Sequence, residues 1–144
     1  MISLIRNSLK IALISISLCA ISPAIYAEGK TITISPWVYK QLNKAEELIG
    51  KQEYSKAHKK LEKVLAKVNK HSYEQAITLR SLASVYALED NYKQAARLLE
   101  QALATKALSE EQQQEALFNL GQLYMATEQY QKTVDTLDPW LKAH

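Results

Sequence analysis

The sequence of 144 residues has only three glycines, three prolines and one cysteine. So few glycines and prolines leave little material for tight turns, which argues against a fold of many short strands and favours an all-helical one. The glycines are far apart, so no glycine-rich loop is present to hold a nucleotide phosphate. The formal net charge is only +3, so no strong field is expected that would attract nucleic acid.

The first 27 residues differ from the remainder and predict a secretory signal. Arg6 and Lys10 are their only charges, residues 11–21 form an apolar run, and Ala27 supplies the small residue that a signal peptidase requires. An uncleaved membrane anchor is the alternative, but the apolar core is shorter than the roughly 20 residues that span a bilayer. We therefore expect residues 1–27 to be a signal peptide, cleaved after Ala27, and the mature protein to be periplasmic.

The single cysteine, Cys19, lies inside the predicted signal. Lipidation of Cys19 is not expected, because the residue before it, Leu18, is not small. After cleavage the protein would have no cysteine and could form no disulfide, so its stability outside the cytoplasm would depend on core packing alone.

One pattern recurs every 38 residues along the remaining chain. A small residue is followed by Leu or Tyr three positions later, then by Tyr, and then by Ala or Thr. The equivalent residues are Ala45, Ala83 and Gly121; Leu48, Tyr86 and Tyr124; Tyr54, Tyr92 and Tyr130; and Ala57, Ala95 and Thr133. Residues three or four apart share a helix face, and a small residue lets a second helix approach closely. Each period therefore predicts two antiparallel helices.

The repeated segments resemble tetratricopeptide repeats, most clearly Ser-Leu-Ala-Ser-Val-Tyr at 81–86 and Asn-Leu-Gly-Gln-Leu-Tyr at 119–124. A non-repeating helix bundle is the alternative, but a bundle has no reason to maintain one offset. The resemblance implies an all-α solenoid of three antiparallel helix pairs. It implies an extended segment at 28–36 and a repeat domain at 37–144, with repeats at about 38–71, 76–109 and 114–144.

The period is longer than the usual one of about 34 residues, and we place the additional helical turn at the junctions 69–73 and 106–111. Two serine–glutamine pairs fit capping boxes that would begin the first helix of the next pair. They are Ser72 with Gln75 and Ser109 with Gln112. Ser35 followed by Pro36 suits the start of the first helix.

The predicted mature sequence contains no recognisable catalytic or metal-binding motif. Its histidines, His58, His71 and His144, form no short His-x-x-His pair, and adjacent acidic residues on a helix diverge by roughly 100°. We expect His58 and His71 to be solvated. The sequence therefore predicts no enzyme activity, no cofactor and no metal site.

A run of lysines with helical spacing predicts a basic stripe on the second helix of the first repeat, formed by Lys56, Lys60, Lys63, Lys67 and Lys70. The stripe has two interpretations, a solvated helix face or a surface for an acidic partner or an anionic envelope surface. Nucleic acid is not favoured, because no aromatic residues alternate with the lysines.

In tetratricopeptide folds the first helix of each pair lines a concave groove, and the resemblance implies which residues face it. They are Tyr39, Leu42, Asn43 and Glu46; Ile77, Arg80, Ser81 and Ser84; and Glu115, Phe118, Asn119 and Gln122. An aromatic residue, an arginine and amides suit a peptide or another helix, although Leu42 and Ile77 are also candidates for the core. Only Asn119 fits the carboxylate clamp of chaperone-binding members, so chaperone-tail recognition is not expected.

A narrower resemblance is carried by residues 35–45, by Tyr-Glu-Gln-Ala at 73–76, and by 123–124 with 128–130. These stretches are similar to periplasmic tetratricopeptide proteins associated with TonB energy-transduction systems of marine Gram-negative bacteria. The resemblance implies an accessory component that works beside TonB, ExbB and ExbD in the import of iron complexes. The alternatives are an assembly factor for pili, secretion or outer-membrane proteins, and a regulatory subunit of an envelope enzyme.

The last predicted helix carries Leu137, Trp140 and Leu141 on a face that no later helix of the sequence would cover. Solenoids normally need a polar terminal cap. We therefore expect a shortened relative of a longer repeat protein, a homo-oligomer formed through this helix, or a docking surface for a partner.

Overall fold

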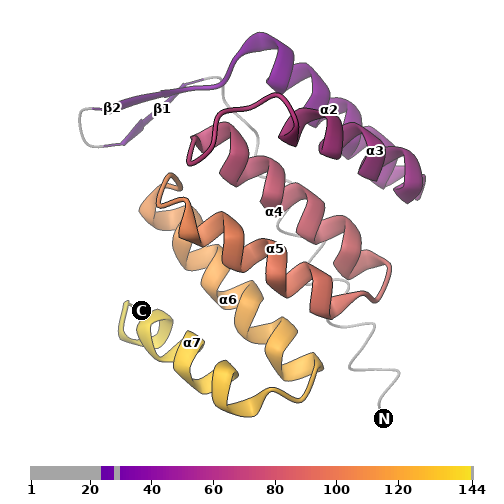
Figure 1. Cartoon of the computed structure of the whole chain (residues 1–144). Helices are drawn as coiled ribbons and strands as arrows, with labels where there is room; N and C mark the ends of the chain where they lie inside the picture. Colours follow the sequence, from indigo (N-terminus) through magenta and orange to yellow (C-terminus); the bar gives the residue numbers. More distant parts are fainter. Residues whose placement is uncertain (1–23, 28–29, 144) are drawn as a thin grey trace.

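In the computed structural model of the chain, the structure is described for residues 24–27 and 30–143. Within that part, six helices form three consecutive antiparallel pairs: α2 (Pro36–Gly50) with α3 (Tyr54–Leu65), α4 (Tyr73–Leu88) with α5 (Tyr92–Ala104), and α6 (Glu110–Ala126) with α7 (Tyr130–Ala143). The pairs stack in chain order (Figure 1). The predicted all-α solenoid of three helix pairs is confirmed.

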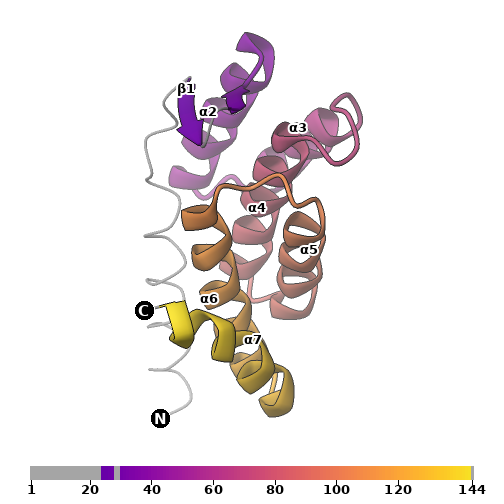
Figure 2. The ribbon, with the colours of Figure 1, turned by 90° about the vertical axis from the view of Figure 1, so that its left-hand side faces the viewer.

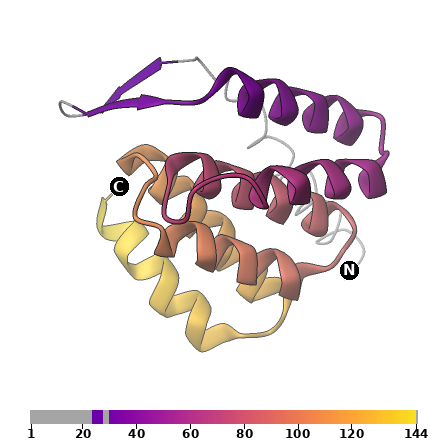
Figure 3. The same ribbon diagram turned by 45° about the horizontal axis from the view of Figure 1, so that its top comes forward.

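A two-stranded hairpin precedes the helices. β1 (Ala24–Ala27) pairs antiparallel with β2 (Lys30–Thr33), and Figure 3 shows the hairpin projecting away from the helical body near the start of α2. The extended segment expected at 28–36 contains β2, whereas the pairing with β1 is not evident from the sequence. Most of the predicted signal peptide, residues 1–23, lies outside the described residues. Its cleavage after Ala27 stays a prediction, and would remove β1.

Serine side chains begin the first helix of each pair, as their sequence positions predict. Ser35 Oγ accepts a hydrogen bond from the backbone N–H of Val38 at 3.4 Å, and Pro36 is the first residue of α2. Ser109 and Gln112 form a complete capping box, with bonds of 3.3 and 3.2 Å. At α4 only half of the predicted box is present. Ser72 Oγ accepts from Gln75 N–H, but the Gln75 side chain accepts from His71 N–H instead.

The turn within each pair has the same backbone conformation in all three repeats. Gln52, Asp90 and Glu128 have φ values of 60°, 62° and 59°, in the left-handed region that glycine most often occupies. In the first turn Gln52 N–H donates to Ile49 O at 2.9 Å and Glu53 N–H to Leu48 O at 2.8 Å. The other turns repeat both bonds. This Schellman arrangement satisfies carbonyl groups at the end of the first helix and reverses the chain.

The core runs along the stack through small and branched apolar side chains. Ala57, Leu61 and Val64 of α3 are fully buried, and the equivalent α5 residues Ala95, Leu99 and Ala102 are buried as well. The first helices α2, α4 and α6 lie along one side and the second helices α3 and α5 along the other (Figure 2). The smallest residue of the pattern, Gly121, allows α6 and α7 to approach closely, because a Cβ atom there would lie 2.5 Å from Leu137 Cδ2.

Candidate protein-binding surface

The side of the solenoid formed by α2, α4 and α6 carries most of the residues that the resemblance assigns to partner binding (Figure 2). We call it the first-helix surface and define it by the partly exposed side chains of Tyr39, Glu46, Arg80, Ser84, Glu115 and Gln122. Tyr39 and Glu46 of α2, and Glu115 and Gln122 of α6, are seven residues or about two helical turns apart. Arg80 and Ser84 of α4 are four residues or about one turn apart. The surface therefore contains a phenol, two carboxylates, one guanidinium, a hydroxyl and an amide.

Arg80 and Glu115 are the two opposite charges of this surface that the fold brings together. Arg80 Nη2 of α4 lies 2.7 Å from Glu115 Oε2 of α6, and the two side chains are 14% and 34% exposed. The guanidinium is thus paired within the chain and joins the second helix pair to the third. Arg80 therefore acts first as a link between repeats, and its charge is largely neutralised by Glu115.

The serines of α4 also bond within their own helix. Ser84 Oγ donates to Arg80 O at 3.2 Å and Ser81 Oγ donates to Ile77 O at 3.1 Å. Each hydroxyl uses its single proton in this bond and keeps lone pairs for accepting another. The two serines of α4 therefore offer acceptors to a partner more readily than donors.

Glu46 is a partly buried carboxylate on the same surface. Burial raises its pKa above the ordinary value, because desolvation penalises the charged form. Among the described residues no ion pair with Glu46 is found. A cation or N–H donor supplied by a partner would offset this desolvation.

Three amide oxygens of α6 are buried without a hydrogen-bond partner among the described residues: Gln114 Oε1, Asn119 Oδ1 and Gln122 Oε1. An unsatisfied buried acceptor costs about 1–3 kcal/mol. Gln122 follows Ser84 by one period and Glu46 by two, so its side chain belongs to the first-helix surface, whereas its Oε1 atom is buried. Glu46 therefore remains the partly exposed acceptor of this surface for which no ion pair is found among the described residues.

Three residues of the predicted groove are buried. Leu42 and Ile77 belong to the core, as the apolar character of both allows. Asn119 is only 4% exposed, so its predicted role as a surface contact is wrong. In the second and third pairs this position is covered by the preceding pair. The equivalent Asn43 is exposed, and the part of the chain that the structure describes has no helix pair before it. Phe118 is 37% exposed and lies between Glu115 and Gln122 on one face of α6, and its ring centroid is 4.9 Å from that of Trp140 of α7. Its place in the groove stays a prediction.

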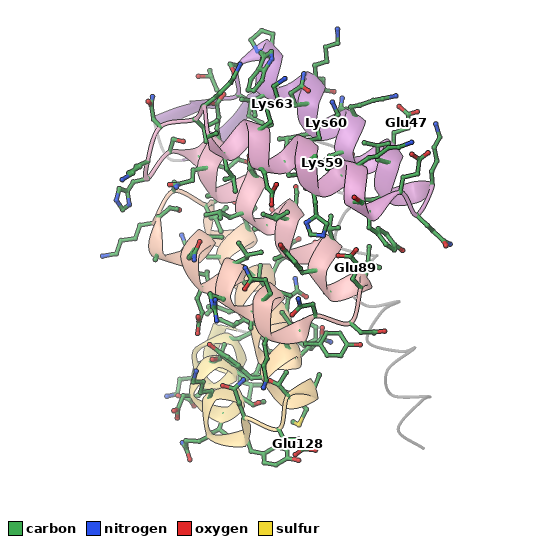
Figure 4. All side chains as sticks on the ribbon, turned by 45° about the vertical axis from the view of Figure 1, so that its right-hand side comes forward. Glu47, Lys59, Lys60, Lys63, Glu89 and Glu128 are labelled. Carbon is green, nitrogen blue, oxygen red and sulfur yellow. The ribbon has the colours of Figure 1, made fainter. Side chains whose placement is uncertain are left out.

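The predicted basic stripe is not one continuous helical feature. α3 ends at Leu65, so Lys67 and Lys70 lie beyond the helix. Lys59 and Lys63 are exposed on α3, where Figure 4 shows them with Lys60. Three lysines of the stripe contact other residues of the chain. Lys56 pairs with Glu53, Lys60 Nζ donates to Gln41 Oε1 at 3.2 Å, and Lys67 Nζ lies 5.0 Å from the Trp37 ring centroid.

The prediction that His58 is solvated is wrong. Its side chain is 14% exposed, its Nε2 lies 2.6 Å from Glu89 Oε2, and its ring packs edge-on against Tyr86 at 4.2 Å. The signal for this burial is the repeat itself, because His58 occupies the position of Ala96 in the second pair. His71 is exposed, as expected.

Among residues 24–27 and 30–143, no cluster of three or more His, Cys, Asp or Glu side chains is arranged to hold a metal ion. In the same part of the chain, none of the helices has the length and apolar character needed to cross a membrane.

Comparison with known proteins agrees with the repeat architecture. A family model described as a tetratricopeptide repeat-like domain matches residues 37–142. The matched range includes all of the three helix pairs except the first residue of α2 and the last residue of α7. No curated protein and no solved structure matches the chain.

Proposed function

The chain belongs to the tetratricopeptide repeat-like domain family, and on this premise we propose that it is a periplasmic scaffold that binds another protein through the first-helix surface. Domains of this family serve in protein–protein interaction and are typically non-catalytic. The family gives the general role, and the surface chemistry of this chain suggests what kind of segment it binds.

The observation that carries the proposal is the partly exposed carboxylate of Glu46 on the first-helix surface. Burial raises its pKa, and no ion pair with it is found among the described residues. This group gains a partner if a bound segment supplies a lysine or arginine. We therefore expect the bound segment to be a basic peptide or helix, held beside the Arg80–Glu115 pair.

The periplasmic location is supported by the sequence of residues 1–27. The charged start, the apolar run and the small residue at Ala27 have the organisation of a cleavable signal. Mass spectrometry of the protein recovered from a periplasmic fraction would test this. A chain that begins at Glu28 is the expected result, and an uncleaved chain retained with the inner membrane would contradict it.

The partner system that we favour is a TonB-type transport complex with its ExbB and ExbD components, in which this chain would be an accessory subunit. The support is the similarity of residues 35–45 and 73–76 to the TonB-associated proteins. The first stretch covers the start of α2 and includes Tyr39 of the first-helix surface. An assembly factor for pili, secretion or outer-membrane proteins would use the same scaffold on other clients.

Affinity capture from envelope extracts with a matched pair of variants tests both parts of the proposal. Glu46→Lys reverses the charge of the unpaired carboxylate. Glu47→Lys makes the same change on the adjacent residue, which is exposed and pairs with Lys44 and Lys51. We expect Glu47→Lys to retain the TonB components and Glu46→Lys to lose them, with both variants equally helical by circular dichroism.

Two other results would change the conclusion. If both variants recover the same partners as the wild type, the first-helix surface is not the binding site. If pilus or outer-membrane insertion machinery is recovered in place of TonB components, the narrower assignment is wrong while the scaffold role stands.

A further inference from the structure

The third helix pair exposes a group of large apolar side chains. Of the six large hydrophobic residues that are exposed in the described part of the chain, five belong to this pair. We call them the C-terminal end face; their exposed fractions rise from 37% to 64% in the order Phe118, Met125, Tyr130, Val134 and Leu141. Isolated exposed apolar residues are ordinary, whereas a contiguous group of them indicates an interaction site.

The repeat shows what covers these positions in the first two pairs. Val134 is equivalent to Ala96, which is buried, and to His58, which packs against Tyr86 of the following helix α4 and against Glu89 at its C-cap. Phe118 is equivalent to Arg80, which pairs with Glu115 of the following helix α6. At both internal junctions the covering element is thus the first helix of the next pair. The end face has the chemistry of such a junction without that helix.

The opposite end of the solenoid cannot supply the missing helix. α2 carries three exposed charged residues, Lys40, Lys44 and Glu47. The equivalent residues of the other first helices are buried: Thr78, Leu82 and Val85 in α4, and Ala116, Leu120 and Leu123 in α6. Glu47 also forms ion pairs with Lys44 and Lys51 at 2.7 and 2.5 Å. Stacking one copy head-to-tail on another would bury these charges against the apolar end face, at a large desolvation cost.

The end face is instead complementary to itself. Tyr130, Val134 and Leu141 of this face, together with the half-buried Leu137 that packs against Gly121, follow one another at intervals of four, three and four residues, the spacing of a coiled-coil seam. This series reads the same in both directions, so two antiparallel copies of α7 present matching intervals. Consecutive helices of the solenoid are antiparallel as well. An antiparallel α7 from a second copy would therefore lie where the first helix of a further pair would lie.

The charges around this stripe allow such contact. The exposed charged residues of α7 are Lys132, Asp135, Asp138 and Lys142, two of each sign, and Lys142 Nζ already lies 2.6 Å from Asp138 Oδ2. Two copies therefore meet without net repulsion. A C2 interface uses the same surface of both subunits, and this face satisfies that requirement.

We propose that the C-terminal end face binds the same face of a second copy, with α7 packed antiparallel against α7 of the other copy. The resulting two-fold dimer joins two solenoids at their apolar ends and leaves both charged ends in solvent. Each dimer then presents two first-helix surfaces. This inference does not depend on the identity of the partner proposed above.

Sedimentation equilibrium of the purified protein over a range of concentrations tests the proposal, with Val134→Glu/Leu141→Glu as the disrupting variant. We expect the wild type to dimerise and the double variant to associate at least about a hundredfold more weakly, because the carboxylates would be buried unpaired. Asn43→Glu places a new carboxylate at the charged end and should leave the dimer unchanged. Circular dichroism and urea unfolding of all proteins check that the variants fold.

Three results would overturn the dimer. A wild type that remains monomeric at about 100 µM would assign the face to a different partner, since a dimer with a Kd of about 1 µM would be almost fully formed at that concentration. Equal association of the wild type and the double variant would place the interface elsewhere. Open-ended assemblies that grow with concentration, and are disrupted by Asn43→Glu, would indicate head-to-tail contact.

Discussion

Arg80 of α4 and Glu115 of α6 form an ion pair of 2.7 Å that joins the second and third helix pairs across the first-helix surface. In a solenoid each repeat contacts only its neighbours, so stability depends on the interfaces between repeats. This pair is one of the few polar contacts that link two first helices, and it lies beside the proposed binding residues. It therefore connects the stability of the scaffold with the shape of its surface.

Replacing Arg80 with Met should destabilise the protein by about 1–3 kcal/mol, because Glu115 would lose its partly buried charged hydrogen bond. Urea unfolding monitored by circular dichroism measures the change. The charge-exchanged variant Arg80→Glu/Glu115→Arg should recover much of the loss, since the same two positions regain opposite charges. An Arg80→Met protein as stable as the wild type would show that the pair contributes little to the junction.

Tyr124→Phe should also weaken a junction, in this case between α5 and α6. The Tyr124 hydroxyl donates to Glu100 Oε1, and burial together with this bond raises the pKa of the phenol. Losing a hydrogen bond to a charged group costs about 1.5–3 kcal/mol, measurable by urea unfolding.

The equivalent change Tyr86→Phe is the matched control for this bond. The Tyr86 ring packs on His58. We expect Tyr86→Phe to lower the free energy of unfolding by less than Tyr124→Phe does. The difference would separate the contribution of the Tyr124 hydroxyl from that of the ring. Equal losses for both variants would contradict the assigned role of the Glu100 contact.

Gln52→Gly should stabilise the first pair. Gln52 has a φ of 60°, and a residue with a Cβ atom adopts this conformation at a cost of roughly 1–2 kcal/mol. Glycine removes that cost but loses more entropy on folding, so the expected net gain is below about 1 kcal/mol. Thermal unfolding would show a higher Tm for Gln52→Gly and little change for Gln52→Ala, and a lower Tm for the glycine variant would refute the argument.

The pH dependence of stability should change when Glu46 is replaced by Gln. Because the pKa of Glu46 is raised in the folded state, the folded protein binds this proton more tightly than the unfolded chain. The stabilisation that Glu46 contributes is therefore fully present below the pKa that its carboxyl has in the unfolded chain. It is lost as pH rises through the pKa that the carboxyl has in the folded protein. Glu46→Gln should remove this loss, so its stability should exceed that of the wild type at pH 7 by more than at pH 4.

Glu47→Gln is the control for this pH effect, since the Lys44 and Lys51 side chains lower the pKa of Glu47 to about 2. For a lowered pKa the stabilising contribution is present above the unfolded pKa and is lost as pH falls toward the folded one. Urea unfolding at pH 4 and pH 7 should therefore show opposite trends for the two substitutions. Parallel trends would contradict the different environments assigned to these neighbouring carboxylates.

The helix pairs are predictable from the sequence because they depend on residue types at fixed spacing. Ala57 and Leu61 of α3 recur as Ala95 and Leu99 of α5, and all four are buried. Ser109 with Gln112 gives the start of α6 through its own side-chain chemistry. Such local signals survive without knowledge of the remaining structure.

The accessibility of the predicted groove residues depends on neighbouring repeats, and the family pattern alone does not provide it. Asn43 and Asn119 have the same residue type and the same repeat position, yet the first is exposed and the second is buried. Within the part of the chain that the structure describes, only the second has a helix pair before it. Comparing the three periods position by position reveals this, because the charges of α2 lie where α4 and α6 carry buried residues.

Two further features were missed for different reasons. The β1–β2 hairpin requires two segments to pair, and neither Ala-Ile-Tyr-Ala nor Lys-Thr-Ile-Thr has a sequence signal that specifies its partner. The end of α3 at Leu65 precedes two of the lysines in the predicted stripe. Helical spacing continues past this residue in the sequence, but the chain turns toward α4 and the stripe is interrupted.

The charged outer side of α2 also sets a direction for the evolution of this repeat array. A duplicated helix pair inserted after α7 would meet an apolar side that already suits a first helix, and it would take the place of the second copy proposed above. A pair inserted ahead of α2 would need Lys40, Lys44 and Glu47 to be replaced first. Longer descendants of this architecture are therefore expected to have gained their additional repeats on the α7 side.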